Sequence, residues 1–232
     1  MPLRLWFRAM WYVVNQKGGV SALGLQRVLG LGSYRTAWTW LHKLRRAMVR
    51  PGRDRLSGTV EVDETYIGGH KPGKRGRGAA GKTLVLIAVE DRTEGFGRIR
   101  LRRVADASAE SLVPAVYESV EPGSTVRTDG WPSYGRLPSL GYVHILARGD
   151  GEVGENLLPL VNRVASLLKR WLTGTHQGAV RASHLDYYLD EFTFRFNRRT
   201  SRSRGKLFYR LAQQAVAIQP VTGRDLRGGH AH

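Results

Sequence analysis

The segment Thr59-Val-Glu-Val-Asp-Glu-Thr-Tyr-Ile67 alternates apolar and polar residues and is rich in β-branched side chains, a pattern typical of a β-strand. The continuous apolar run at 83–89 is typical of a strand that is buried on both faces. Residues 97–104 alternate strictly, as in a strand with one face in water. The three segments predict three consecutive strands of antiparallel type.

Helices and strands alternate in the rest of the chain. The pattern predicts a helix at 108–120, a strand at 124–129, a short helix, a strand at 142–146, and helices at 157–172 and 182–196. Three strands followed by helix, strand, short helix, strand and helix is the ribonuclease-H arrangement. We therefore expect an α/β fold, a ribonuclease-H-like mixed five-stranded sheet flanked by helices.

The first fifty residues are expected to be helical. Ser21 can cap a helix that runs through Leu29, Gly30 breaks it, and a second helix starts at Ser33 or Tyr34. Two short helices around a glycine-containing turn, with basic side chains on the second, suggest a helix-turn-helix. A plain helical hairpin with a solvated basic face is the alternative.

The composition indicates a polyanionic partner. The chain has 232 residues, with 37 Lys and Arg against 19 Asp and Glu, a net charge of +18. Nucleic acid is the partner that best explains this charge, although basic proteins can also carry it for solubility or ribosome association. Because 41% of the residues are apolar, with six Trp and nine Tyr, the chain is not a disordered basic tail.

Several classes of protein are not expected. The absence of Cys excludes disulfides, thiolate zinc sites and a cysteine nucleophile. No stretch has the roughly 18 uncharged apolar residues of a membrane span, and the N-terminus does not resemble a signal peptide. We therefore expect an intracellular, cytoplasmic protein.

Two aspartates are candidate metal ligands. Asp63 lies within the first strand, and Asp129 ends the later strand immediately before Gly130. The first and fourth strands are neighbours in the ribonuclease-H arrangement, so the two carboxylates should converge, and a divalent cation would compensate their repulsion. Oxygen ligands without Cys favour Mg²⁺ or Mn²⁺ over zinc. Alternatively, Asp63 caps a strand end and Asp129 forms an Asx-type turn with Gly130.

A third ligand should come from the helix at 157–172. Asn162 and Lys169 are seven residues apart, about 10.5 Å along one side of a helix. The amide oxygen of Asn162 can bind a cation, although Asn162 cannot act as a base. The alternatives are a solvated Asn162, or Glu152 or Glu155 as the ligand if an acid is needed.

A nucleotide-binding pattern is also present. Gly76-Arg-Gly-Ala-Ala-Gly-Lys-Thr83 matches G-x4-G-K-[ST], which works only after a strand and at the start of a helix. Here a basic loop precedes it and a strand follows. ATPase function is therefore not expected.

Five ordered motifs together resemble bacterial insertion-sequence transposases with an ISXO-type DDE domain. The motifs are VEVDETYIGG (60–69), KRGRGAAGKT (74–83), VRTDGWPSY (126–134), SLLKRWLTGTH (166–176) and HLDYYLDEFTFRFNRR (184–199). The resemblance extends from about residue 5 to residue 215, nearly the whole chain.

The resemblance implies a ribonuclease-H-like core that cuts and joins DNA ends with Mg²⁺. It places the catalytic aspartates at Asp63 and Asp129, the third catalytic residue at Asn162, where some members have Glu, and the following lysine at Lys169, which would hold a phosphate. Family members usually begin with a cysteine-rich zinc ribbon. Because this sequence has no Cys, we expect a variant lacking that ribbon, a fragment or a shortened copy.

The resulting expectation is an insertion-sequence transposase with three regions. These are a helix-turn-helix-like DNA-binding region at 1–55, the DDE catalytic domain at 56–215 and a flexible C-terminal tail at 216–232. Element ends and target DNA are the expected partners, with a homodimer or higher assembly during synapsis, at the bacterial nucleoid. The alternative is a non-catalytic helix-turn-helix DNA-binding protein or an inactive remnant.

Basic residues in three places are expected to contact the DNA backbone, fixing position rather than reading sequence. They are Arg35, Lys43, Arg45 and Arg46 on the second N-terminal helix; Lys71, Lys74, Arg75, Arg77 and Lys82 in the basic loop; and Arg170, Arg195, Arg198 and Arg199 near the C-terminal helices. Trp131 could stack on a displaced base or belong to the core.

Overall fold

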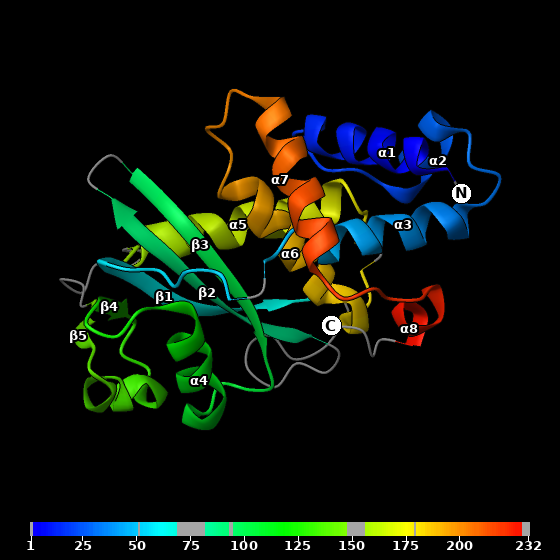
Figure 1. Ribbon diagram of the computed structural model, residues 1–232. Coiled ribbons are helices and arrows are strands. Elements are labelled where there is room, and N and C mark those ends of the chain that lie inside the picture. Colours follow the sequence, from blue (N-terminus) through cyan, green and yellow to red (C-terminus); the bar gives the residue numbers. More distant parts are fainter. Residues whose placement is uncertain are drawn as a thin grey trace. The chain divides into compact units, whose positions relative to one another are not determined.

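The computed structural model describes most of the chain (Figure 1). The described residues are 2–50, 52–68, 82–92, 95–147, 156–178 and 180–228. By its contacts the chain divides into two compact units. The sheet unit is Asp54–Arg170, and the helical unit combines Met1–Arg53 with Trp171–His232. This division differs from the three predicted regions, whose status as domains stays a prediction.

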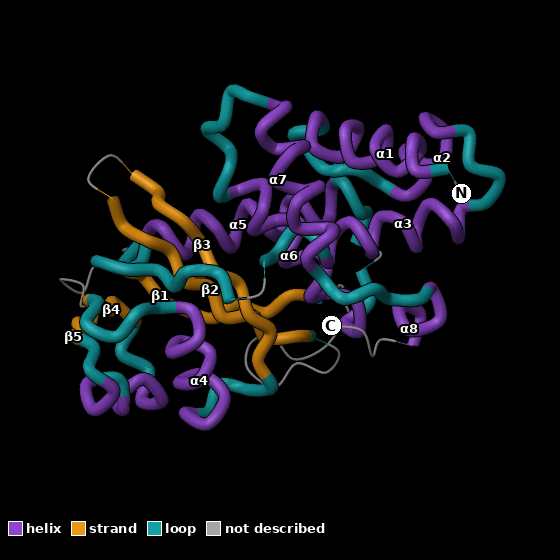
Figure 2. The backbone as a smooth tube through the Cα atoms, viewed as in Figure 1, coloured by secondary structure: helices purple, strands orange, loops and turns teal. Residues whose placement is uncertain are grey.

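The sheet unit is built on a five-stranded sheet with strand order β3-β2-β1-β4-β5 (Figure 2). The strands are β1 (Thr59–Ile67), β2 (Thr83–Arg92), β3 (Gly95–Val104), β4 (Thr125–Thr128) and β5 (Val143–Leu146). The first three pair antiparallel, whereas β4 pairs parallel with both β1 and β5. This mixed topology confirms the predicted ribonuclease-H-like fold.

Helices cover both faces of the sheet. Helix α4 (Ala109–Ser119) packs Leu112 and Val116 against a core that includes Val60 and Val62 of β1. These side chains alternate with Glu61, which points to the opposite face and bonds to the first turn of α5 (Pro159–Gly174). The strand β2 is buried on both sides, as its uninterrupted apolar run predicted. The short 3₁₀ helices η1 (Pro132–Arg136) and η2 (Pro138–Leu140) link β4 to β5.

The helical unit has its own apolar core. Its elements are α1 (Leu3–Asn15), α2 (Ala22–Leu29), α3 (Tyr34–Arg46), the 3₁₀ helix η3 (Ala182–His184), α6 (Leu185–Phe196), α7 (Arg204–Ala217) and α8 (Gly223–Gly228). Ser21 caps α2 by accepting a hydrogen bond from the Gly24 N–H, as predicted. The rings of Trp6 and Trp40 stack at 3.9 Å between centroids, joining α1 to α3.

Two further findings concern the helices. Within the segment expected to be a flexible tail, the structure places the short helix α8, whose Leu226 is fully buried and whose carbonyl contacts the His184 ring. Among the described residues, no helix has both the length and the apolar character needed to cross a membrane.

A buried ion network links three helices of this unit. Glu191 on α6 is 1% exposed and accepts hydrogen bonds from Arg45 of α3 and Arg195 of α6, each at 2.7 Å. Arg195 also donates to the carbonyls of Val13 and Gln16 at the end of α1. Burial alone would raise the pKa of Glu191, but the two arginines outweigh it and lower the pKa to about 2.

The first prediction concerns the stability that this network provides. Glu191→Gln leaves two buried guanidinium groups without a counter-charge, so we expect the free energy of unfolding at pH 7 to fall by about 3–5 kcal/mol. Because the folded pKa of Glu191 lies below its ordinary value of 4.5, the parent chain should lose this stability as pH falls from 4.5 to about 2. Glu191→Gln should lack that component of the pH dependence in urea unfolding.

The matched control is Glu110→Gln, which removes an exposed ion pair with Arg136 and should change stability by less than about 0.5 kcal/mol. An equal loss in both variants would contradict the assignment.

Candidate active site

The pairing of β1 with β4 determines where the two predicted aspartates lie. The strands run parallel with Thr59 opposite Thr125 and Glu61 opposite Arg127. Continuing this register by two residues places Asp63 opposite Asp129, which directly follows the last residue of β4. Since neighbouring strands are about 4.8 Å apart, the register supports adjacent backbones at these two positions.

By the alternation of strand residues, the two aspartates are expected on the same face of the sheet. Glu61 and Arg127 form an ion pair at 3.5 Å, so their side chains lie on one face of the sheet. Asp63 is the next residue of β1 on that face, and Asp129 continues the same alternation from Arg127. The helix α5 contacts this face through Glu61.

Tyr134 is a buried tyrosine that is hydrogen-bonded to the residue following Asp63. Its hydroxyl is buried and donates to Glu64 Oε2 at 2.8 Å. Burial raises the pKa of Tyr134 most, followed by the charge of Glu64, and the charges of Asp63 and Asp129 raise it further. The charges of both aspartates thus oppose ionisation of the same hydroxyl.

Local hydrogen bonds orient each aspartate. The Trp131 N–H donates to Asp129 Oδ1 at 3.0 Å, and Gly130 adopts a φ of +83°, which glycine tolerates best. The Asx-type turn that the sequence offered as an alternative is thus present, and Asp129 Oδ1 is the oxygen that accepts its hydrogen bond. The Glu64 N–H donates to Asp63 Oδ1 at 2.8 Å. Asp63 is half-buried and Asp129 is exposed.

Asn162 lies in the first turns of α5, at the border between its buried and exposed sides. Its amide nitrogen donates to Asn156 Oδ1 at 2.6 Å, so the amide oxygen is the atom suited to a cation. Val161 and Val164 are buried, whereas Asn162 is exposed. In the sequence, Asn162 comes directly after Leu160 and Val161, the two α5 residues whose N–H groups are hydrogen-bonded to Glu61 of β1.

Lys169 lies two turns further along α5, near a second lysine. Burial lowers the pKa of Lys169, and the charge of Lys82 lowers it further. Lys82 precedes the first residue of β2, which pairs with Ile67 at the end of β1. The structure thus groups two of the predicted phosphate-binding lysines within the sheet unit.

The predicted ligand set suits a hard divalent cation. Its atoms are carboxylate and amide oxygens, the ligands that Mg²⁺ and Mn²⁺ prefer. In the part of the chain that the structure describes, no group of three or more His, Cys, Asp or Glu side chains could hold a metal ion. Asn162 stays the predicted third ligand at Asp63 and Asp129. The substitutes Glu152 and Glu155 lie outside the described residues.

The structure corrects one predicted DNA contact. Arg45 is 2% exposed, ion-paired with Glu191, and its guanidinium lies 4.0 Å from the centre of the Tyr188 ring. A side chain engaged in this way cannot reach a DNA backbone, so the expectation for Arg45 is wrong. Helical spacing placed Arg45 on the basic side of α3, but α6 supplies an acid against it.

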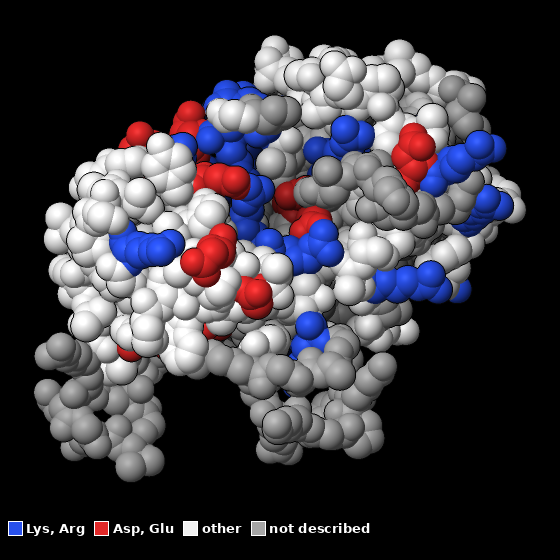
Figure 3. Space-filling model, turned by 90° about the horizontal axis from the view of Figure 1, so that it is seen from below, with Lys and Arg blue, Asp and Glu red and all other residues white. Residues whose placement is uncertain are grey.

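The other predicted contacts are divided between the two units. Lys82 and Arg170 belong to the sheet unit, whereas the helical unit holds Arg35, Lys43, Arg46, Arg195, Arg198 and Arg199. Arg35 and Arg199 are exposed; Arg195, which serves the Glu191 network, is mostly buried. On the face drawn in Figure 3, basic side chains have acidic ones among them. Lys71, Lys74, Arg75 and Arg77 lie outside the described residues.

The fold also bears on two other sequence features, the nucleotide-binding pattern and Trp131. Thr83, the last residue of the nucleotide-binding pattern, begins the strand β2 and not a helix. The helix N-terminus that this pattern requires is therefore absent at this position. Trp131 is partly buried against the core and donates its indole N–H to the Ala107 carbonyl at 3.0 Å, which supports the core interpretation.

Sequence reasoning missed four residues around the aspartates: Glu61, Glu64, Arg127 and Tyr134. The alternation of strand residues puts Glu61 on the same face as Asp63, a signal that could have found it. The sequence pattern could not have predicted the contact of Tyr134 with Glu64, because Tyr134 lies in the 3₁₀ helix η1 and not in a strand with regular alternation.

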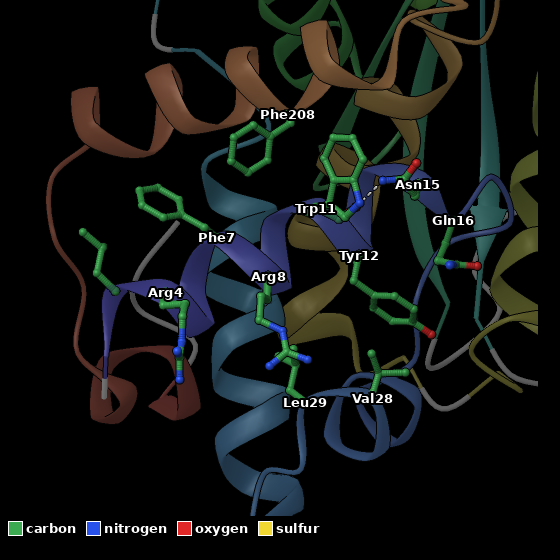
Figure 4. A pocket seen from close by; sticks show the side chains of 11 residues that line it. Arg4, Phe7, Arg8, Trp11, Tyr12, Asn15, Gln16, Val28, Leu29 and Phe208 are labelled. Atoms are coloured by element: carbon green, nitrogen blue, oxygen red, sulfur yellow. Dashed lines mark hydrogen bonds between the residues drawn. The ribbon is translucent and has the colours of Figure 1, made fainter.

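A pocket of about 800 Å³ lies elsewhere, within the helical unit (Figure 4). Phe7 and Trp11 of α1 line it and pack edge-on against Phe208 of α7, and Arg4 and Arg8 also line it. No predicted catalytic residue lines this pocket, so it is separate from the candidate active site.

The comparison with protein families decides the identity. The ISXO2-like transposase domain matches residues 55–197, more than half of the chain. The chain belongs to the ISXO2-like transposase family. The matched region includes Asp63, Asp129 and α5, so the transposase domain contains the candidate active site. A comparison with curated proteins finds no match.

Two solved structures are distantly similar to this transposase. The catalytic core domain of BIV integrase has 15% identity and a TM-score of 0.41, covering 71% of this chain and 100% of that one. A simian T-cell lymphotropic virus intasome in complex with PP2A regulatory subunit B56 gamma has 16% identity and a TM-score of 0.35, covering 71% and 63%. The fold assignment rests on strand order and not on these likenesses.

The second prediction tests the lysine pair at the end of α5. Lys82→Ala removes a neighbouring positive charge, so the pKa of Lys169 should rise toward its ordinary value of 10.5. The ¹³Cε chemical shift of Lys169, followed by NMR across alkaline pH, measures this change. Lys43→Ala, in the helical unit, is the control and should leave the pKa of Lys169 unchanged. If the pKa of Lys169 is the same in both variants as in the parent chain, Lys82 is not its neighbour.

Proposed function

We propose that this transposase cuts and joins DNA strands by metal-dependent phosphoryl transfer, moving a bacterial insertion sequence. The observation that supports this most directly is the β1–β4 register, which pairs Glu61 with Arg127 and, continued by two residues, would set Asp63 opposite Asp129. Two aligned carboxylates are a natural ligand pair for a divalent cation, which lowers the cost of their repulsion.

In this proposal each residue has a defined task. Asp63 and Asp129 hold Mg²⁺ or Mn²⁺ together, and the amide oxygen of Asn162 completes the set. A bound divalent ion would supply Lewis-acid stabilisation of the attacking and leaving oxygens at the phosphate. Lys169 binds a phosphate of the substrate strand, with Lys82 beside it, and so fixes the position of the reacting strand.

The surrounding protein would hold the DNA ends. Arg35, Lys43 and Arg46 on α3 and the basic residues after α6 are proposed to neutralise backbone phosphates, which explains the charge of +18. The helices α2 and α3, joined by a glycine-containing turn, are proposed as a helix-turn-helix. Joining both ends of an element requires two active sites, so we propose at least a homodimer, acting on chromosomal and element DNA at the nucleoid.

The third prediction concerns the two aspartates. Asp63→Asn and Asp129→Asn each remove a charged ligand, and Mg²⁺-dependent nicking and joining of element-end DNA should fall by roughly 100-fold or more. DNA affinity should persist or rise, because one negative charge is lost. Glu110→Gln, an exposed acid on α4, is the control and should keep full activity.

This experiment also discriminates the second candidate, a non-catalytic DNA-binding protein. DNA binding without any metal-dependent cleavage in the parent chain would favour that alternative. Activity that is unaffected by either aspartate change would refute the active-site assignment.

The fourth prediction ranks the third ligand. Asn162→Ala should reduce joining less than either aspartate change, because a neutral amide attracts a cation less strongly than a carboxylate. Single-turnover joining assays at several Mg²⁺ concentrations measure the difference. If Glu155→Gln is more damaging than Asn162→Ala, the third ligand has been misassigned.

A further inference from the structure

The first turn of α5 is bonded to a carboxylate far away in the sequence. The Leu160 N–H donates to Glu61 Oε2 at 2.9 Å, and the Val161 N–H donates to the same oxygen at 3.2 Å. The N–H groups in the first turn of a helix have no acceptor within that helix. Pro159, the first residue of α5, has no N–H at all. Glu61 on β1 therefore caps α5, with its negative charge at the positive end of the helix dipole.

Glu61 is also tied to the strand on its other side. It is 1% exposed, and its Oε1 lies 3.5 Å from Nη1 of Arg127 on β4. The same Arg127 nitrogen lies 3.7 Å from Asp91 Oδ2 on β2. A buried carboxylate is costly unless it is paired and hydrogen-bonded, and the partners of Glu61 on β4 and α5 offset part of that cost. Burial still raises the pKa of Glu61, although the two N–H groups and Arg127 lower it.

The positions of these residues match those of the proposed ligands. Glu61 precedes Asp63 by two residues, Arg127 precedes Asp129 by two, and the helix residues that Glu61 caps come directly before Asn162. We infer that Glu61 is a positioning residue: through Arg127 and the first turn of α5, it fixes the three proposed ligands relative to one another. This inference rests on the proposed function.

The test compares two substitutions at Glu61. Glu61→Ala removes both the helix cap and the ion pair, whereas Glu61→Gln keeps an oxygen that can accept from the α5 N–H groups. Mn²⁺ affinity of the DNA-free protein, measured by electron paramagnetic resonance, should fall about 10- to 100-fold in Glu61→Ala and less in Glu61→Gln. The kcat for joining should fall in the same order, with the KM for DNA unchanged.

The matched control is Glu90→Ala. Glu90 is also a buried strand carboxylate, 3% exposed and paired with Arg98 at 2.6 Å, but its bonds go to β3 and the segment before β1 instead of α5. It should lower the melting temperature as Glu61→Ala does, yet leave Mn²⁺ affinity unchanged. Equal loss of Mn²⁺ affinity in both variants, or wild-type affinity and kcat in folded Glu61→Ala, would overturn the inference.

Hydrogen exchange separates this inference from the function on which it rests. Amide exchange at 160–165 should be faster in Glu61→Ala than in the parent chain and in Glu90→Ala, with or without catalysis. Unchanged exchange there would overturn the capping role. A parent chain that neither binds Mn²⁺ nor joins DNA would instead contradict the proposed function, and faster exchange would still support the capping role.

Discussion

The parallel pairing of β1 with β4 is the constraint on which the active site depends. This short ladder, from Thr59 opposite Thr125 to Glu61 opposite Arg127, fixes which residues become neighbours beyond it. A slip of one residue would turn the aspartate of one strand to the opposite face, because strand side chains alternate. The ion pair between buried Glu61 and partly exposed Arg127 penalises such a slip, since a shift in either direction would leave the Glu61 carboxylate buried without its partner.

Most of the fold could be predicted from the sequence, because periodicity follows from burial on one or two faces. The limits of β1 were predicted to the residue, and those of β2, β3, α4 and α5 were close to the observed ones. Asp63 and Asp129 could be selected because acids at such strand positions need a partner, and the strand order then predicted that they would be neighbours. Their metal-binding role stays a proposal.

Contacts between distant segments could not be predicted, since periodicity carries no information about partners. Arg45 belongs to the basic side of α3 by spacing, yet Glu191 buries it. Glu61 belongs to a strand by pattern, yet it caps a helix about one hundred residues later. In both cases one buried charge organises several elements, and only the tertiary fold shows which ones.

The most direct test of the account is anomalous diffraction from crystals of this transposase soaked in Mn²⁺. We expect an anomalous peak bound by carboxylate oxygens of both Asp63 and Asp129, at metal–oxygen distances of about 2.1 Å, with Asn162 beside it. Carboxylates separated by more than about 10 Å, or Mn²⁺ bound only elsewhere, would contradict a shared metal site.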